Sequence, residues 1–471
     1  AAPSCMVERF FAAQVWLDGA WARDVLLSVG ADGKWAELQP GASAAQAQGA
    51  TRLAGPVLPG LVNAHSHAFQ RAIAGLTELA GAAGSSDDFW SWRDRMYSAA
   101  RRITPEQLEH IAAWLYAELL AGGYTQVCEF HYLHQPQDTV GGDPLVMSMA
   151  LVRAAQRVGM GLTLLPTLYM RSGFGATGLR EDQRRFASSP YSLVRLVGEV
   201  QAACRDLPGV NLGLAIHSLR AAGLPAMTEL AAWAGTQQLP VHIHIAEQTQ
   251  EVQDCLAHTG QRPIQWLLEN LPVNAQWNLV HATHASSAEL QAVAQRGAAI
   301  VICPSTEANL GDGVFNYPAY AAADGHWSVG SDSHVTRSWP QELCLLEYSQ
   351  RLTLRRRNVA AQPSGSSAAA LFDGALAGGQ AASGLQLGPI ALGHRADFVV
   401  LDAQSPALLG VPDAQTLDAL VFSSPHARIA QVYQGGRLRL DGGELCRPGA
   451  EPGLRQRLAQ DFARTMGELW G

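Results

Sequence analysis

Lysine is almost absent from this 471-residue chain. It occurs once, at Lys34, and the other 32 of its 33 basic side chains are arginines. Schiff-base chemistry and a phosphate-binding loop both depend on a lysine at the reacting centre. A catalytic lysine is therefore confined to one position near the N-terminus, which nearly excludes both mechanisms.

Paired cysteines and long apolar runs are also missing. The seven cysteines are scattered, odd in number and without a CxxC pair, so neither a disulfide framework nor a thiolate zinc site is expected, and we predict most of them to be small buried hydrophobes. No run reaches the roughly 18 apolar residues of a membrane span, and no basic stretch followed by an apolar run marks a secretory signal. We expect a cytoplasmic location. Whether residues 1–5, which precede Met6, are native stays open.

Basic clusters are scarce as well. The formal charge is -8, which argues against a nucleic-acid surface. The one basic run, Arg355 to Arg357, is predicted to be a solvated helix face or helix end. The 48% of hydrophobic residues indicate a globular protein with a well-buried core.

The length favours one large domain and one smaller domain. Asp18-Gly19 and Asp32-Gly33 are hairpin signals near the N-terminus. Near the other end, short strands are predicted in "ADFVVLDA", "ALVFSSP" and "IAQVYQGGRLRLDGGEL". We therefore predict a small β-sandwich domain built from both chain ends, residues 1–56 and 386–446, around a catalytic domain at 57–385, with a C-terminal helix at 447–471.

The middle of the chain alternates short apolar runs with helical segments. Eight runs recur: "PVLPGLVNAHSH", "YTQVCEFHY", "GLTLLPTLY", "VNLGLAIHS", "PVHIHIAE", "WNLVHATH", "AAIVICP" and "HWSVGSD". Continuous apolar runs are typical of strands buried on both faces of a parallel sheet. Capping boxes start helices at Thr104 with Gln107 and at Ser286 with Glu289. Eight such strands predict a (β/α)8 TIM barrel; an open doubly wound sheet is the alternative.

Polar residues gather where these runs end, which is where a barrel of this type carries its active site. Nine of the 15 histidines lie at these ends: His65, His67, His131, His217, His242, His244, His281, His284 and His334. This clustering favours the barrel over the open sheet.

A metal site is predicted from the spacing of these histidines. His65 and His67 are two apart on a strand and share a face, so both imidazoles can bind one ion. An isolated HxH pair is weak evidence, but this one ends the first run. His242 and His244 repeat the pair; we expect His244 to face the ion and His242 to be structural. Asp332, at the last run, adds a carboxylate unless it caps a helix.

The motifs "PGLVNAHSHAFQRA", "HIHIAEQ", "LVHATH" and "GSDSH" resemble the amidohydrolase superfamily, and "LGHRADFVVLD" resembles its C-terminal β-domain segment. Many members of that superfamily hold two metals bridged by a carboxylated lysine. With Lys34 as the only lysine, that bridge is not expected here. The resemblance therefore implies the single-metal deaminase branch.

Within that branch, "FWSWRDRMY", "EFHYLH", "AIHSLRAA" and "STEANLGDG" are similar to the formimidoylglutamate deiminase family of histidine degradation. The resemblance implies hydrolysis of N-formimidoyl-L-glutamate to N-formyl-L-glutamate and ammonia, with one divalent ion, usually zinc. It places the metal ligands at His65, His67, His244 and Asp332, the catalytic residues at Glu247, His281 and Asp332, and the substrate contacts at Gln70, Arg93, Tyr132, His217 and Arg220.

The implied mechanism has an ion-activated water attacking the formimidoyl carbon. Glu247 is expected to carry a proton to the leaving ammonia, and His281 to stabilise the tetrahedral centre. Arginine suits a substrate with two carboxylates, and Arg220 is the candidate clamp. Arg93, beside Trp90 and Trp92, is predicted to lie on a loop that closes over the site. Alternatively, Arg93 forms an ion pair at the surface. The alternative for the two tryptophans is packing in the core.

Several alternatives stay open. The enzyme could be a single-metal aminohydrolase of a heterocycle such as guanine, or it could act on N-formimidoyl-L-aspartate, since one methylene discriminates by only about 1–3 kcal/mol. A two-metal amidase and a catalytically silent metal-binding protein are further alternatives. Iron or manganese would tolerate the ligands, and Tyr132 and His217 could be satisfied polar groups. A homodimer is expected, with a small-molecule substrate as the partner, and neither nucleic acid nor membrane.

Overall fold

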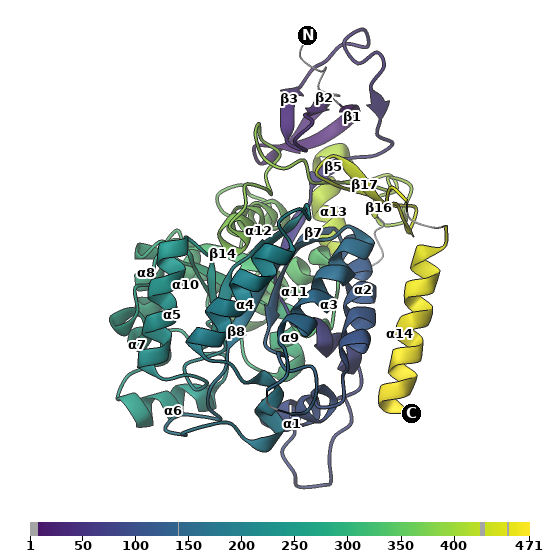
Figure 1. Ribbon diagram of the computed structural model, residues 1–471. Coiled ribbons are helices and arrows are strands. Elements are labelled where there is room, and N and C mark those ends of the chain that lie inside the picture. Colours follow the sequence, from purple (N-terminus) through teal and green to yellow (C-terminus); the bar gives the residue numbers. More distant parts are fainter. Residues whose placement is uncertain (1–7, 140, 424–428, 450–451) are drawn as a thin grey trace.

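The computed structural model describes residues 8–139, 141–423, 429–449 and 452–471. The question of residues 1–5, including Cys5, lies outside these ranges. Figure 1 shows a barrel with a smaller β-rich part at one end. At the opposite end lie α1 (Phe89–Ala100) and α6 (Thr249–Thr259), which follow the carboxyl ends of the first and fifth barrel strands.

The eight apolar runs form the predicted barrel. Its strands are β6 (Leu61–Ser66), β7 (Tyr124–His131), β8 (Gly161–Leu168), β10 (Leu214–Ile216), β11 (Val241–Ile245), β12 (Trp277–His281), β13 (Ala299–Ile302) and β14 (His326–Val329), paired in that order. The pairs along this path are parallel. A parallel bridge between Ser66 and Asp332 joins the last strand to the first. The fourth run is split, since β9 (Val210–Leu212) precedes β10 and pairs with β8. The barrel prediction is confirmed.

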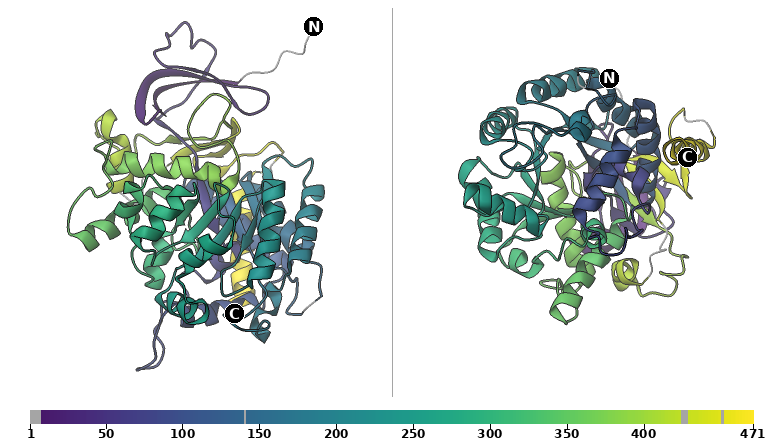
Figure 2. Two further views of the ribbon diagram at one scale, coloured as in Figure 1. Left: turned by 90° about the vertical axis from the view of Figure 1, so that its left-hand side faces the viewer. Right: turned by 90° about the horizontal axis from the view of Figure 1, so that it is seen from below.

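Helices surround these strands, as the view along the barrel shows (Figure 2). They are α2 (Pro105–Ala121), α3 (Leu145–Val158), α4 (Pro190–Ala203), α5 (Leu224–Gln237), α7 (Pro263–Asn270), α8 (Ser287–Gln295), α9 (Pro304–Leu310), α10 (Tyr317–Ala322), α11 (Trp339–Leu354) and α12 (Ser367–Ser383), with short 3-10 turns at Ala68–Ile73, Glu181–Phe186 and Asp413–Gln415. Both predicted capping boxes are present: the Thr104 hydroxyl accepts from the Gln107 amide at 3.1 Å, and Ser286 accepts from Glu289 at 3.1 Å.

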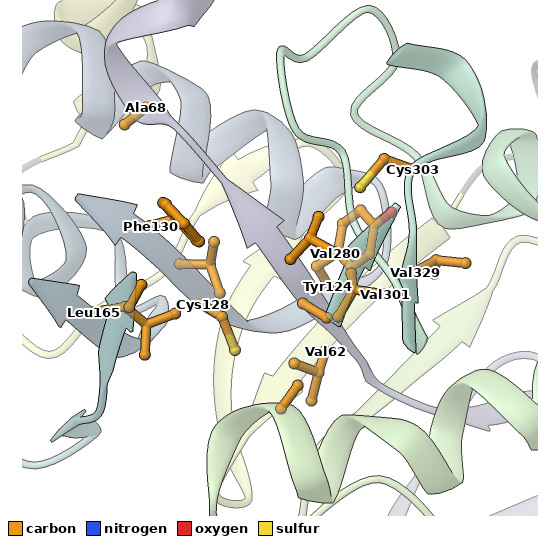
Figure 3. Packing of buried hydrophobic residues seen from close by; sticks show 14 of the residues in the cluster. Val62, Ala68, Tyr124, Cys128, Phe130, Leu165, Val280, Val301, Cys303 and Val329 are labelled. Atoms are coloured by element: carbon orange, nitrogen blue, oxygen red, sulfur yellow. The ribbon is translucent and has the colours of Figure 1, made fainter. Parts of the chain in front are cut away.

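The inside of the barrel is filled by apolar side chains. Val280 and Val301 lie opposite one another in the register of β12 and β13 and so share a face with His244, and Figure 3 shows them close together; both are fully buried. Each such side chain stabilises the fold by about 1.5–3 kcal/mol relative to an exposed one. Four of the six described cysteines are buried free thiols, so the expectation that most cysteines are small buried hydrophobes is confirmed.

The two chain ends form one further sheet. It contains β1 (Glu8–Leu17), β2 (Ala20–Val29), β3 (Trp35–Gln39), β4 (Thr51–Arg52), β5 (Val57–Pro59), β15 (Phe398–Leu401), β16 (Ile429–Gln434), β17 (Arg437–Asp441) and β18 (Glu444–Leu445). The strand order is β18-β17-β16-β15-β5-β1-β2-β3, and β4 pairs with β1 off this path. Both predicted hairpins are present. β5 pairs with β1 and β15, so the chain leaves this sheet only just before β6 begins.

One predicted strand is wrong. Residues 419–422 of "ALVFSSP" belong to helix α13 (Thr416–Phe422), while residues 424 and 425 lie outside the described ranges. Leu417, Leu420 and Val421 are buried at helical spacing, and the helix contacts α11 and α12. A short apolar run such as this one fits a helix or a strand, and packing against two helices makes it helical. The last helix, α14 (Leu454–Trp470), contacts α2. Within the described residues, none of the helices has both the length and the apolar character that a membrane span requires.

Candidate active site

Three imidazoles and one carboxylate converge at the carboxyl end of the barrel. The Nε2 atom of His244 lies 3.0 Å from Nε2 of His65 and 3.2 Å from Nε2 of His67. Asp332 Oδ1 lies 3.3 Å from both of the latter atoms. All four residues are buried. The structure therefore brings the four predicted ligands, from β6, β11 and the end of β14, to one point.

The orientation of two of these imidazoles tests whether a cation fits. His67 Nδ1 lies 2.9 Å from the carbonyl oxygen of Phe130, and His244 Nδ1 lies 2.8 Å from that of His217. A carbonyl only accepts, so each Nδ1 carries the proton and each Nε2 presents a lone pair to the centre. Lone pairs 3.2 Å apart repel one another unless a cation lies between them. Ligands bound at about 2.0–2.1 Å in a tetrahedron would lie about 3.3 Å apart, so the four atoms fit one divalent ion.

Burial and charge keep these groups in the protonation states that a metal needs. Burial lowers the pKa of His65 to about 3, and it also lowers the pKa values of His67 and His244. Burial alone would raise the pKa of Asp332, but the neighbouring histidines, His65 foremost, outweigh it and lower that pKa below its usual range. Neutral imidazoles and an ionised carboxylate are the forms that bind metal.

A second group of side chains lies beside this centre. His281 Nε2 lies 3.5 Å from Glu247 Oε2 and 3.6 Å from Asp332 Oδ2. Burial alone would lower the pKa of His281, but the negative charges of Glu247, Glu307 and Asp332 outweigh it and raise that pKa to about 10. His281 therefore carries two N–H donors, and its Nε2–H points toward the space between the two carboxylates.

Strained backbone aims these residues into the site. Ala246, His281 and Asp332 have positive φ values of 51°, 76° and 51°, a region that costs a non-glycine residue about 1–2 kcal/mol. Each lies where a barrel strand ends, and the turn at Ala246 directs Glu247 back over the barrel. Such strain is concentrated at functional sites, where the surrounding structure maintains it.

Glu307 was not identified from the sequence. Its Oε2 accepts from His281 Nδ1 at 2.9 Å and from the Cys303 amide at 2.8 Å, so it fixes the imidazole on one side. Glu307 lies on α9, directly after β13, and is buried. The seventh run has no histidine at its end, but the glutamate four residues after Cys303 in "CPSTE" was a usable signal.

The remaining predicted residues line a pocket above the ion site. Its lining consists of His67, Gln70, Phe89, Trp92, Arg93, Met96, Tyr97, Tyr132, His217, Arg220, His244, Glu247, His281, Leu310 and Asp332. All eleven predicted site residues except the fully buried His65 are among them. Phe89, Met96, Tyr97 and Leu310 were not predicted, because apolar and aromatic residues on a helix are most often core.

Two guanidinium groups line this pocket, those of Arg93 and Arg220. Arg93 stacks on Trp90 at 4.7 Å and on Tyr97 at 5.3 Å, and Arg220 lies 5.6 Å from the Trp90 ring. The Nε atoms of both arginines are buried and have no hydrogen-bond partner among the described residues. Arg93 thus lines the pocket, and among the described residues it forms no surface ion pair. Both arginines retain donors for a ligand.

Other polar groups at the mouth have structural partners. Gln70 Nε2 donates to the Tyr132 hydroxyl at 3.2 Å, and His217 Nδ1 lies 3.1 Å from the Ser218 hydroxyl. His242 points away from the ion site, with Nε2 2.8 Å from the carbonyl of Ala382, as expected of a structural residue. Lys34 forms a bridge with Arg395 in the terminal sheet, which leaves no lysine at the barrel mouth.

The amidohydrolase family model matches residues 57–439. Formimidoylglutamate deiminase of Pseudomonas aeruginosa is 45% identical over 461 residues, covering 98% of this chain and 99% of that protein. The crystal structure of an amidohydrolase from Brucella melitensis has 40% identity and a TM-score of 0.90, covering 98% of this chain and 100% of that one.

More distant relatives share the fold. A zinc-containing adenosine deaminase structure from Xanthomonas campestris is 22% identical, with a TM-score of 0.77 and 98% of both chains covered. A parallel barrel that carries four converging metal-binding side chains and a neighbouring glutamate–histidine pair at its mouth is typical of a hydrolytic enzyme. The chain belongs to the amidohydrolase family.

The ion site leads to a first prediction. The protein should bind one equivalent of divalent metal, and His244→Ala should lower metal affinity by removing one of four ligands. Elemental analysis of dialysed samples measures both. His242→Ala, which changes the neighbouring histidine outside the cluster, is the control and should retain the metal. Two equivalents in the parent protein would contradict the single-ion site.

Glu307 leads to a second prediction. Glu307→Gln should lower kcat roughly 10- to 100-fold, because a charge-assisted hydrogen bond is worth about 1.5–3 kcal/mol. Metal content should be unchanged, since Glu307 contacts His281 and none of the four ligands. Steady-state kinetics and elemental analysis on one sample check this. Unchanged kcat would show that Glu307 does not hold the imidazole in its working position.

Proposed function

We propose that this enzyme hydrolyses N-formimidoyl-L-glutamate to N-formyl-L-glutamate and ammonia. The observation that carries the proposal is one pocket that joins the Glu247–His281 pair to two guanidinium groups, each with a buried Nε that has no hydrogen-bond partner among the described residues. Two guanidinium groups suit a substrate with two carboxylates. The 45% identity to formimidoylglutamate deiminase over nearly the whole chain supports the same substrate.

We propose zinc as the ion, bound by His65, His67, His244 and Asp332. Three imidazoles and a carboxylate are ligands that zinc accepts. When bound, such an ion lowers the pKa of a coordinated water toward about 7 and so supplies a nucleophile at neutral pH. The predicted homodimer and cytoplasmic location stay predictions.

The protein's own residues handle the protons. One water adds to the formimidoyl carbon, and its proton is accepted by the carboxylates of Asp332 and Glu247, which flank His281 Nε2 at 3.6 and 3.5 Å. Protonated His281 donates its Nε2–H to the oxygen of the tetrahedral centre. Glu247 delivers the first proton of the water to the imino nitrogen. When the carbon–nitrogen bond breaks and the carbonyl of the formyl group forms, the hydroxyl of the tetrahedral centre gives up the second proton to these carboxylates, which pass it to the same nitrogen, and the nitrogen leaves as ammonia. One water is consumed for each ammonia released.

Binding of the remainder of the substrate is assigned to the other end of the pocket. Arg220 and Arg93 receive the two carboxylates. Gln70, Tyr132 and His217 line the same pocket, with Tyr132 next to His67 and His217 next to His244. α1, which carries Arg93, is proposed to close over the bound substrate and exclude water.

Ammonia release tests this function. Purified protein should act on N-formimidoyl-L-glutamate with a far higher kcat/KM than on N-formimidoyl-L-aspartate or guanine, with metal content measured on the same sample. If kcat/KM is highest for N-formimidoyl-L-aspartate, the substrate is the compound that is one methylene shorter. Preferential release from guanine would overturn it.

A further inference from the structure

One buried carboxylate connects the two ends of the active site. Glu251, in the first turn of α6, is 2% exposed. Its Oε1 accepts from Arg220 Nη1 at 3.1 Å, and its Oε2 accepts from the backbone amide of Ala246 at 2.5 Å. Arg220 belongs to the substrate end of the pocket, whereas Ala246 immediately precedes Glu247.

The Ala246 amide lies in the turn that aims Glu247. With φ at +51°, this residue has an unfavourable conformation. Both of its backbone polar groups are bound from outside the turn, the amide by Glu251 and the carbonyl by the amide of His284 at 3.0 Å. A hydrogen bond from a backbone amide to an ionised carboxylate is of the stronger, charge-assisted kind. Glu251 therefore contributes to holding the strained turn.

The same carboxylate fixes the guanidinium of Arg220. A long arginine side chain has considerable rotamer entropy, and a buried partner on one edge leaves the others directed into the pocket. Arg220 Nε remains buried and without a partner among the described residues. The side chain is thus oriented by Glu251 while retaining donors for a substrate carboxylate.

We infer that Glu251 is a positioning residue that sets the distance between the carboxylate clamp, Arg220, and the proton carrier, Glu247. This inference rests on the proposed function of the pocket. It assigns Glu251 no contact with substrate or ion. The consequence is that loss of Glu251 has two separable effects, one on binding through Arg220 and one on turnover through Glu247.

The test compares Glu251→Gln with the parent on three substrates: N-formimidoyl-L-glutamate and its two analogues that each lack one carboxylate. kcat should fall roughly 10- to 100-fold on all three, the effect of one charge-assisted hydrogen bond. KM should rise for the full substrate but not for the analogue that lacks the carboxylate bound by Arg220. A purely structural role would lower apparent kcat with KM unchanged for every substrate, and this result would overturn the inference.

A matched control exists in the same chain. Glu347 is also fully buried and also joins an arginine, Arg351 at 3.1 Å, to a backbone amide, that of Val359 at 2.6 Å, but it does not line the pocket. Glu347→Gln should leave kcat and every KM unchanged. Glu251→Asp retains the charge but is too short to span both partners, so it should behave like Glu251→Gln. Parent-like kinetics of the aspartate variant would overturn the inference.

Different results would contradict the proposed function and the role of Glu251. If the parent enzyme does not release ammonia from N-formimidoyl-L-glutamate, the proposed function fails whatever the variant does. Hydrogen exchange then decides the role of Glu251: the peptide containing Ala246 to Gln248 should exchange faster in Glu251→Gln than in the parent or in Glu347→Gln. Unchanged exchange would show that Glu251 does not hold this turn.

Discussion

Replacing Glu247 by glutamine is expected to lower kcat about 100- to 10,000-fold, the usual contribution of a positioned acid or base. Glutamine has nearly the same shape, so it can fill the space next to His281, from which the glutamate oxygen is 3.5 Å away. It can neither take a proton from the attacking water nor deliver one to the leaving nitrogen. KM should change little, because among the described residues no hydrogen bond or ion pair joins Glu247 to Arg93 or Arg220.

Two measurements separate this effect from damage to the ion site or the fold. Elemental analysis should find the parent's metal content, since Glu247 is not one of the four converging ligands. Glu289→Gln is the matched control, because Glu289 is a buried carboxylate in the capping box of α8 that does not line the pocket. It should lose about 0.5–2 kcal/mol of stability and keep its kcat. A parental kcat in Glu247→Gln would show that Glu247 does not transfer the proton.

The strands and their polar ends were predictable because the signals are local. Each barrel strand is a continuous apolar run, and the active site of this fold lies at the carboxyl ends of its strands. His65 and His67 needed only the two-residue repeat of a strand to be placed on one face. The capping boxes at Thr104 and Ser286 are likewise contained within four residues.

The features that could not be predicted are contacts between residues that are far apart in the sequence and close only in the folded structure. Arg220 and Glu251 are 31 residues apart, and no local pattern indicates that they pair. Arg93 stacks on Trp90 within α1, but Arg220 reaches the same ring only when α1 folds over the mouth. The run "ALVF" fits a helix and a strand equally, and its contacts with α11 and α12 made it a helix. Local patterns thus predicted the barrel and the four side chains that converge at its mouth, while the contacts that support them became visible only in the folded structure.

Removing the carboxylate clamp should have the second largest effect. Arg220→Met retains the length and apolar body of the side chain but removes its charge and its donors. Truncating one partner of a buried, hydrogen-bonded charge pair costs about 2–5 kcal/mol, which corresponds to a roughly 30- to 5,000-fold loss of kcat/KM for N-formimidoyl-L-glutamate. The loss should include a higher KM, because Arg220 acts on the bound substrate before the chemical step.

The substrate itself supplies the decisive control for this variant. Formamidine carries the reacting group but no carboxylate, so Arg220→Met should change its slow hydrolysis far less than that of the glutamate derivative. Arg351→Met is the matched protein control, since Arg351 pairs with the buried Glu347 at 3.1 Å and lies outside the pocket. It should keep full kcat/KM. A heterocycle such as guanine offers no carboxylate to Arg220, so an Arg220→Met enzyme with parental kcat/KM would favour that substrate class over a dicarboxylate.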